Sequence, residues 1–176
     1  DDRHGFERRV HPEYHPQARF QADGDWDAPI TDEHVMLEAV RTAGPTDAST
    51  PNEQYDTAVT EAALAEIDRL AARASDRPWA LTVGFVSPHF PYAISRRYYD
   101  RYADVAIPLP RPAPGGRCYE ELVPAQMRDC RRWLGLSTDG LTDDQVRAAR
   151  RAYYGLISFL DGLVGRLVAR LEERGV

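Results

Sequence analysis

The stretch that decides the fold is WALTVGFVSPHFPY, residues 79–92. Its first part, residues 79–86, is almost entirely apolar and rich in β-branched and aromatic types, which is typical of a strand buried on both faces of a parallel sheet. Pro88 and Pro91 cannot donate to a sheet ladder, so the strand is expected to end before His89. Ligands of open α/β sheets bind beyond the carboxyl ends of the strands, which makes His89 a candidate catalytic or substrate-contacting residue. A histidine that only caps the strand fits the same position equally well.

A helix is predicted immediately before this strand, over residues 52–74. Thr50, Pro51 and Glu53 supply a cap residue, a first-turn proline and the glutamate of a capping box. The apolar residues that follow recur at helical spacing, so one stripe of this helix should face a core. The stripe consists of Val59, Ala63, Ile67, Leu70 and Ala74.

The last predicted helix covers residues 143–174 and opens with a second capping box, from Thr142 to Gln145. Gly155 and Gly165 lie inside it, and each costs about 1 kcal/mol relative to alanine. We therefore expect both glycines to pack closely against another backbone. The apolar stripe predicted to face the core consists of Val146, Tyr153, Ile157, Leu160, Val164, Leu167 and Leu171.

The remaining segments are less regular. Residues 1–50 are rich in Pro, Gly, Asp and His and form an irregular, loop-rich segment. A short helix is predicted over residues 95–102, a proline-rich surface crossing over 107–116 and a further helix over 120–134. Residues 51–176 therefore make up the α/β part of the chain.

Composition limits the classes of function. The 176 residues are enough for one domain, and the formal net charge of −6 argues against non-specific nucleic-acid binding. No apolar stretch is expected to be long enough to span a bilayer. Cys118 and Cys130 are too few for a disulfide scaffold and lack CxxC spacing. Two free thiols in a cytoplasmic protein are the simplest interpretation.

A single strand that is apolar on both faces cannot be stable alone, because it needs neighbouring strands on its edges and helices on both faces. The rest of the chain offers no obvious partner strand. We therefore expect a piece of a larger α/β enzyme, whose sheet is incomplete in this chain.

Three segments, in this order and spacing, resemble the sulfatase family of the alkaline-phosphatase-like superfamily, and within it the choline-sulfatase-like branch. Residues 2–9, DRHGFERR, are similar to the family's HGFE-x-R stretch. Residues 77–92, RPWALTVGFVSPHFPY, resemble its PFFLTVSFTHPHDPY segment. Residues 150–167, RRAYYGLISFLDGLVGRL, resemble RRAYYA-x-IS-x-LD-x-x-VG-x-LL. The ordered set covers nearly the whole chain.

This resemblance implies an alkaline-phosphatase-like α/β fold, a parallel or mixed sheet flanked by helices, with residues 1–176 as the central part of a single catalytic domain. It implies hydrolysis of a small-molecule sulfate ester to an alcohol and sulfate. The family's nucleophile is a formylglycine made from the cysteine of a Cys-x-Pro-x-Arg motif, and it acts beside a Ca²⁺ or Mg²⁺ ion. Neither Cys118 nor Cys130 opens such a motif. Nucleophile and metal ligands are therefore expected outside this chain, with no metal ligand within it.

His89 is the residue of this chain to which the resemblance assigns a role. The run His89-Phe90-Pro91 matches the histidine of the family's His-x-Pro position. By resemblance, His89 would be both catalytic and substrate-binding, contacting the sulfate and assisting departure of the alcohol. Ser87 stands where the family segment has a second histidine, so any role of that second histidine is absent.

The resemblance does not extend to choline as the substrate. The choline-sulfatase branch carries DIYPADFGW, whose tryptophan can hold a quaternary ammonium by cation–π attraction. Residues 11–20 read HPEYHPQARF instead. Tyr14, Phe20 or Trp26 could substitute for that contact.

Two other functions fit the same residues. One is a phosphodiesterase or phosphonate monoester hydrolase of the same superfamily, which differs mainly in its nucleophile and pocket. The other is a non-catalytic relative that keeps the α/β fold as a binding module. A Cys-x-Pro-x-Arg motif upstream would support a sulfatase, and Thr or Ser there would favour phosphoryl transfer. No nucleic-acid or membrane partner is expected, and a homo-oligomer is compatible with each alternative.

Overall fold

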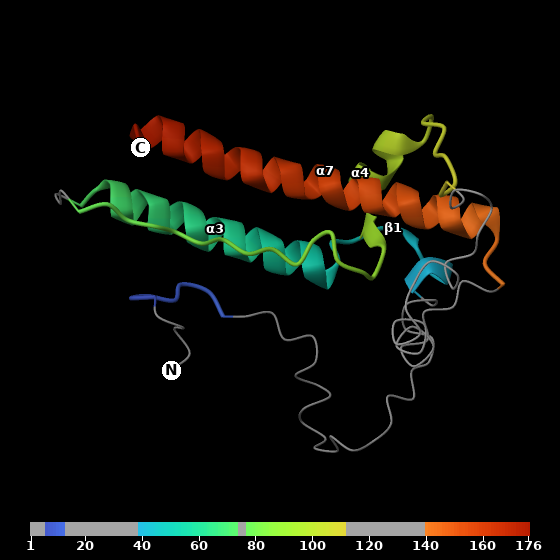
Figure 1. Ribbon diagram of the computed structural model, residues 1–176, viewed down its shortest axis with the longest axis horizontal. Helices are drawn as coiled ribbons and strands as arrows, with labels where there is room; N and C mark the ends of the chain where they lie inside the picture. Colours follow the sequence, from blue (N-terminus) through green and yellow to red (C-terminus); the bar gives the residue numbers. More distant parts are fainter. Residues whose placement is uncertain (1–5, 13–38, 74–76, 112–139) are drawn as a thin grey trace, which may run out of the picture.

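The computed structural model describes residues 6–12, 39–73, 77–111 and 140–176. Two long helices lie side by side and run in the same direction, with a short sheet against the longer one (Figure 1). The helix predicted over residues 120–134 lies outside the described residues. In chain order the elements are β1 (Gly44–Thr46), α3 (Pro51–Ala71), β2 (Ala93–Ser95), α4 (Arg96–Tyr99), the 3₁₀ turn η1 (Asp100–Tyr102) and α7 (Asp143–Arg174).

The sheet confirms the α/β class and the parallel strand direction. β1 and β2 pair in parallel, with Gly44 opposite Ala93 and Thr46 opposite Ser95. Parallel neighbours need a crossover connection rather than a tight turn. Here α3 and the segment that follows it provide the crossover, so β1, α3 and β2 form one strand–helix–strand unit.

The prediction of a strand over residues 79–86 is wrong in this structure. The segment runs along α3 without regular secondary structure (Figure 1). Leu81, Val83 and Phe85 are half-buried, whereas the residues between them are exposed. This alternation is that of an extended chain packed on one side only. A strand also needs ladder hydrogen bonds, and the described residues give this segment no pairing neighbour.

Both long helices begin where the capping boxes predict. At α3 the Thr50 hydroxyl accepts from the Glu53 amide at 3.2 Å, and the Thr50 amide donates to the Glu53 carboxylate at 2.9 Å. At α7, Thr142 and Gln145 make the same reciprocal pair. The α3 stripe is confirmed as far as the helix is described, because Val59, Ala63, Ile67 and Leu70 are all buried. Ala74 lies outside the described residues.

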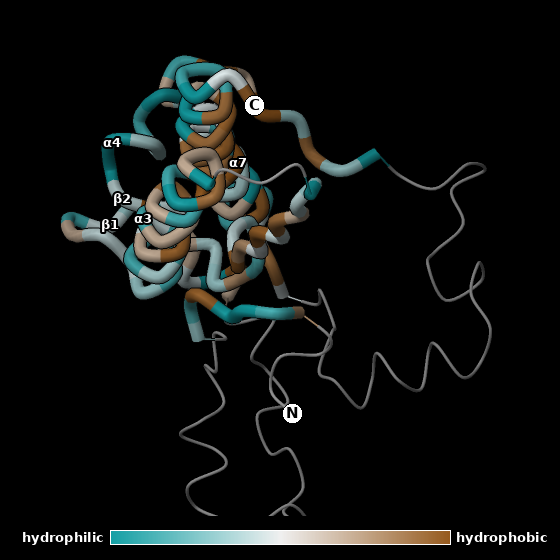
Figure 2. The backbone as a smooth tube through the Cα atoms, turned by 90° about the vertical axis from the view of Figure 1, so that its left-hand side faces the viewer, coloured by the Kyte–Doolittle hydropathy of each residue, from teal (hydrophilic) through white to brown (hydrophobic). Residues whose placement is uncertain are grey.

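The stripe predicted for α7 is only partly correct. Tyr153, Ile157 and Val164 are each at least 40% exposed. The face that does pack is the neighbouring one, which joins β2 in a cluster of Ile94, Ala152, Leu156, Phe159 and Leu163. Ala152 and Gly155 on this face let α7 approach β2 closely, whereas the larger side chains of the predicted stripe do not. Figure 2 shows hydrophobic and hydrophilic residues mixed along the helix.

Gly155 shows this close approach directly. A Cβ placed there would lie 3.0 Å from Ile94 Cγ2 and 3.4 Å from the Tyr98 backbone, so the expected close packing is confirmed. For Gly165 the expectation is wrong, because no described atom lies within 4 Å of such a Cβ.

Ion pairs between α3 and α7 fix the parallel alignment of the two helices. Asp68 accepts from Arg170 at 2.7 Å and from Arg174 at 2.8 Å, and Glu61 pairs with Arg166 at 2.6 Å. Hydrogen bonds from Arg174 and then Arg170 hold the pKa of the Asp68 carboxyl below its ordinary value. These pairs are solvent-accessible, so they contribute more to register than to stability.

α7 also corrects an expectation drawn from composition. By length and composition alone it is apolar enough to cross a membrane, although the sequence was expected to contain no such segment. Helices of a protein core pass the same test. Here α7 packs Ala152, Leu156, Phe159 and Leu163 against β2 and pairs its arginines with α3.

The two helix glycines give a matched test of packing. Gly165→Ala is expected to raise the free energy of unfolding by about 1 kcal/mol, because alanine favours the helix and nothing described obstructs its methyl group. Gly155→Ala is expected to lower it, because the methyl group meets Ile94 and the Tyr98 backbone. Chemical denaturation of the full-length protein measures both. Equal gains would contradict the close packing at Gly155.

The Asp68 carboxyl predicts a pH dependence. Its folded pKa lies below the ordinary 3.8, so its stabilising effect is complete above that pH and is lost as the pH falls through the lower folded pKa. Asp68→Asn should therefore reduce the steepness of acid destabilisation below about pH 4, measured as the free energy of unfolding against pH. Asp161→Asn, at an exposed carboxylate of α7, is the control. Identical pH profiles for the two variants would show that the Asp68 pairs do not form.

Candidate functional site

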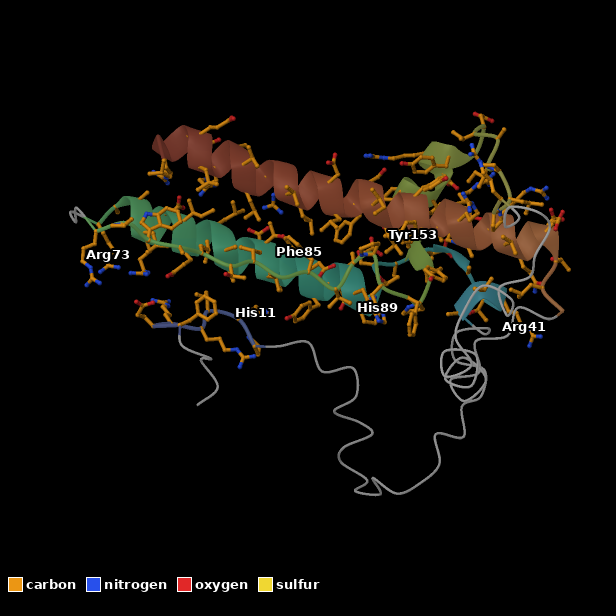
Figure 3. All side chains as sticks on the ribbon, in the orientation of Figure 1. His11, Arg41, Arg73, Phe85, His89 and Tyr153 are labelled. Atoms are coloured by element: carbon orange, nitrogen blue, oxygen red, sulfur yellow. The ribbon has the colours of Figure 1, made fainter. Side chains whose placement is uncertain are left out.

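His89 lies in a tight loop between the segment along α3 and strand β2. Its backbone amide donates to the Val86 carbonyl at 2.9 Å, which closes a turn. The peptide bonds before Pro88 and Pro91 are both cis. Figure 3 shows His89 beside the N-terminal end of α3 and Phe85 further along the same helix. The loop thus presents an exposed imidazole at the end of α3 where the sheet begins.

The contacts of the His89 ring determine which nitrogen is available. Nδ1 lies 2.7 Å from the Phe90 carbonyl oxygen, and the imidazole is tilted by 33° against the Phe90 ring, with 4.2 Å between the ring centroids. A carbonyl can only accept, so Nδ1 carries the proton in this contact. Among the described residues, Nε2 has no hydrogen-bond partner. Nε2 is therefore an acceptor when the ring is neutral and a donor when it is protonated.

A buried carboxylate of α3 holds the backbone just before His89. Asp56 is 0% exposed, and its two carboxylate oxygens accept from the Val86 and Ser87 amides, each at 2.8 Å. The Thr60 hydroxyl donates to the Asp56 backbone carbonyl one turn further on. The connection between α3 and the loop is thus made through backbone amides, whatever side chains the loop carries.

A second buried carboxylate joins α3 to the sheet. Glu53 is 1% exposed and accepts from the Ser95 amide at 3.1 Å and from the Ser95 hydroxyl. Because residues three apart lie on the same face of a helix, Glu53 and Asp56 point to the same side of α3. Together they attach the beginning of the loop and the end of β2 to one helix.

These two carboxylates were missed as site residues in the sequence. Glu53 already had a role as the capping-box residue, which explained only one of its contacts. The available signal was the phase of the polar residues: Glu53, Asp56 and Thr60 fall in line with the apolar stripe that continues at Ala63 and Ile67. Acidic residues on the core-facing stripe of a helix need partners, and here the partners are backbone amides.

The described residues do not form a metal site. Within them, no three His, Cys, Asp or Glu side chains come together. Asp56 and Glu53 direct their oxygens at N–H and O–H donors, so they do not fit the role of cation ligands. Cys118, Cys130 and the aromatic residues proposed to replace the choline contact lie outside the described residues.

His89 lines neither of two grooves on the described surface. One groove runs between residues 6–12, α3 and residues 77–84, and a second lies beside Tyr92, Leu109 and Tyr153. Among the described residues, the candidate site therefore consists of one exposed imidazole that lies outside both grooves.

The sequence of this chain is similar to a known family and to several known proteins. The family described as Sulfatase matches residues 9–176. A choline-sulfatase from Rhizobium meliloti (strain 1021) is 34% identical over 183 residues, which cover 98% of this chain and 34% of that protein. An arylsulfatase from Clostridium perfringens is 31% identical over 109 residues, covering 62% of this chain and 21% of the relative.

A third relative belongs to the wider superfamily. The multifunctional alkaline phosphatase superfamily protein PehA of Trinickia caryophylli is 30% identical over 107 residues, covering 56% of this chain and 21% of that protein. The chain thus spans between a fifth and a third of the length of these curated relatives.

Proposed function

Because the chain belongs to the sulfatase family, we propose that it forms part of the catalytic domain of a sulfuric ester hydrolase. Such an enzyme cleaves a sulfate ester to an alcohol and sulfate. The observation that carries the proposal is His89, held by its backbone and by Nδ1 while Nε2 is left open. A rigidly held imidazole with one accessible nitrogen is suited to contact a small anionic group.

The chemistry of sulfuryl transfer gives His89 a defined role in this proposal. As the ester bond breaks, negative charge builds on the departing alkoxide oxygen. A protonated imidazole can donate its Nε2–H to that oxygen and stabilise the charge, because Nδ1–H remains bonded to the Phe90 carbonyl. General acid catalysis of this kind contributes typically 10²–10⁴-fold to the rate.

The rest of the reaction belongs to other parts of the protein in this proposal. The family's nucleophile and divalent cation supply the attack on sulfur and the stabilisation of the sulfate oxygens. The described residues hold no cluster that could bind such a cation, and neither cysteine opens a Cys-x-Pro-x-Arg motif. In this proposal, the contribution of the described residues is therefore to hold His89.

One second function is favoured by a specific finding. The similarity to a multifunctional alkaline phosphatase superfamily protein supports hydrolysis of a phosphodiester or phosphonate monoester as the alternative. The same imidazole could donate its proton to the alkoxide that leaves a phosphodiester or a phosphonate monoester. The two functions are separated by assaying a sulfate ester, a phosphodiester and a phosphonate monoester of one alcohol with the full-length protein.

The substrate is proposed as a small-molecule sulfate ester, without choline as the preferred alcohol. The choline-sulfatase relative covers almost the whole chain, but residues 11–20 read HPEYHPQARF, which lacks the tryptophan that would hold a quaternary ammonium. Alkyl and aryl sulfates without a cationic group are therefore the first substrates to test.

Three substitutions of His89 test the mechanism in the full-length enzyme. His89→Ala should lower kcat by about 10²–10⁴-fold with little loss of folding. His89→Asn keeps a donor near the Nδ1 position and removes Nε2, so it should be as impaired as alanine. His89→Gln places an amide near the Nε2 position and should recover part of the loss without restoring proton transfer.

The comparison of leaving groups separates proton donation from binding. Loss of kcat should be smaller on aryl sulfates than on alkyl sulfates, because a phenolate needs less protonation to leave. Equal loss on both would exclude general acid catalysis by His89. A stable, fully active His89→Ala enzyme would remove His89 from the site.

A further inference from the structure

We propose that Asp56 is a positioning residue of the active site, whose buried carboxylate sets the orientation of the His89 loop; this inference rests on the proposed function. Asp56 does not touch the substrate. It acts on the reaction through the backbone that carries the imidazole.

The geometry of the Asp56 contact is specific. Both carboxylate oxygens are used, one for each of two consecutive amides, at 2.8 Å to Val86 and 2.8 Å to Ser87. The N–H groups of Val86 and Ser87 are therefore both directed at the Asp56 side chain on α3. A neutral amide side chain offers only one acceptor oxygen, and its NH₂ group would face the second amide donor to donor.

The contact continues from these amides to His89. The Ser87 amide donates to Asp56 at 2.8 Å, and the Val86 carbonyl of the same peptide group accepts from the His89 amide at 2.9 Å. Hydrogen bonds linked through one peptide group polarise and strengthen one another. The turn that carries the imidazole is thus held by a series of hydrogen bonds that begins at Asp56.

The burial of Asp56 indicates more than a surface contact. Its side chain is 0% exposed, and among the described residues no Arg or Lys pairs with it. A buried carboxylate without a cationic partner is costly unless its hydrogen bonds are complete. The side chain of Asp56 fixes both loop amides at once, and an imidazole aimed at a reacting atom requires a backbone fixed in this way.

Two neighbouring residues serve as matched controls. Glu53 is also buried on the same face of α3, but it holds Ser95 at the end of β2 rather than the residues before His89. The hydroxyl of Ser87 is buried and has no hydrogen-bond partner among the described residues, while its amide belongs to the Asp56 contact. Glu53→Gln therefore probes loss of a buried carboxylate, and Ser87→Ala probes loss of the loop side chain.

The experiment is a double-mutant cycle in the full-length enzyme with alkyl and aryl sulfates. Asp56→Asn should lower kcat on the alkyl sulfate by about 10–10²-fold with a smaller change in KM, because a displacement of the imidazole by the order of 1 Å costs about that much. In the His89→Ala background, Asp56→Asn should cost nothing further in kcat. Ser87→Ala should leave kcat unchanged. Glu53→Gln should lower the melting temperature and reduce kcat per folded molecule by less than Asp56→Asn does, because Glu53 holds β2 rather than the residues before His89.

Several outcomes would overturn the proposal. If Asp56→Asn lowers stability as Glu53→Gln does but keeps its kcat, Asp56 is only structural. If its effect on kcat adds fully to that of His89→Ala, Asp56 does not act through His89. If the wild-type protein hydrolyses no sulfate ester, the proposed function itself is wrong. If His89→Ala lowers kcat and Asp56→Asn does not, only the inference about Asp56 is wrong.

A second variant and a measurement on the wild type cover the case in which Asp56→Asn does not fold. Asp56→Glu keeps the charge and displaces the oxygens, and it should show the same split between kcat and KM. In the wild-type protein, amide hydrogen exchange should be slow at Val86 and Ser87. Exchange there as fast as in exposed loop residues would contradict the contact itself.

Discussion

The described structure depends on the attachment of two separate segments to one face of α3 by buried carboxylates. Asp56 holds the amides of Val86 and Ser87, and Glu53 holds Ser95 while it also closes the capping box at Thr50. Buried backbone amides need hydrogen-bond acceptors, and buried carboxylates need hydrogen-bond donors. The contacts of Asp56 and Glu53 with these amides satisfy both groups. As a result, strand β2 and the His89 loop are both attached to the same face of α3.

The packing of α7 completes this arrangement. Ile94 of β2 is 0% exposed and lies against Ala152, Leu156 and Phe159 of α7. Gly155 allows the approach, since a Cβ there would meet Ile94 at 3.0 Å. Ile94 is therefore held by α7, while the next residue, Ser95, is held by α3. The loop that carries His89 ends in this doubly held strand.

Much of this fold could be predicted from local sequence patterns, and the failures have a common cause. Capping boxes and helical spacing located both long helices, because these signals depend only on nearby residues. The hydrophobic pattern of a segment does not show which of its apolar surfaces packs against another element. Tyr153 and Ile157 form an apolar stripe but remain exposed, and residues 79–86 have strand composition but no pairing neighbour in the described part of the chain. His89 was predicted as a site residue from its position, whereas Asp56 was missed because its partners are backbone amides thirty and thirty-one residues away.

The central claim is that α3 aims the free nitrogen of His89 at a sulfate group. The most direct measurement is a crystal structure of the full-length protein with sulfate bound. The account predicts His89 Nε2 within hydrogen-bond distance, about 2.7–3.2 Å, of a sulfate oxygen, with the Val86 and Ser87 amides still bonded to Asp56. A sulfate bound elsewhere, or an imidazole turned away from it while the Asp56 contacts persist, would contradict the account.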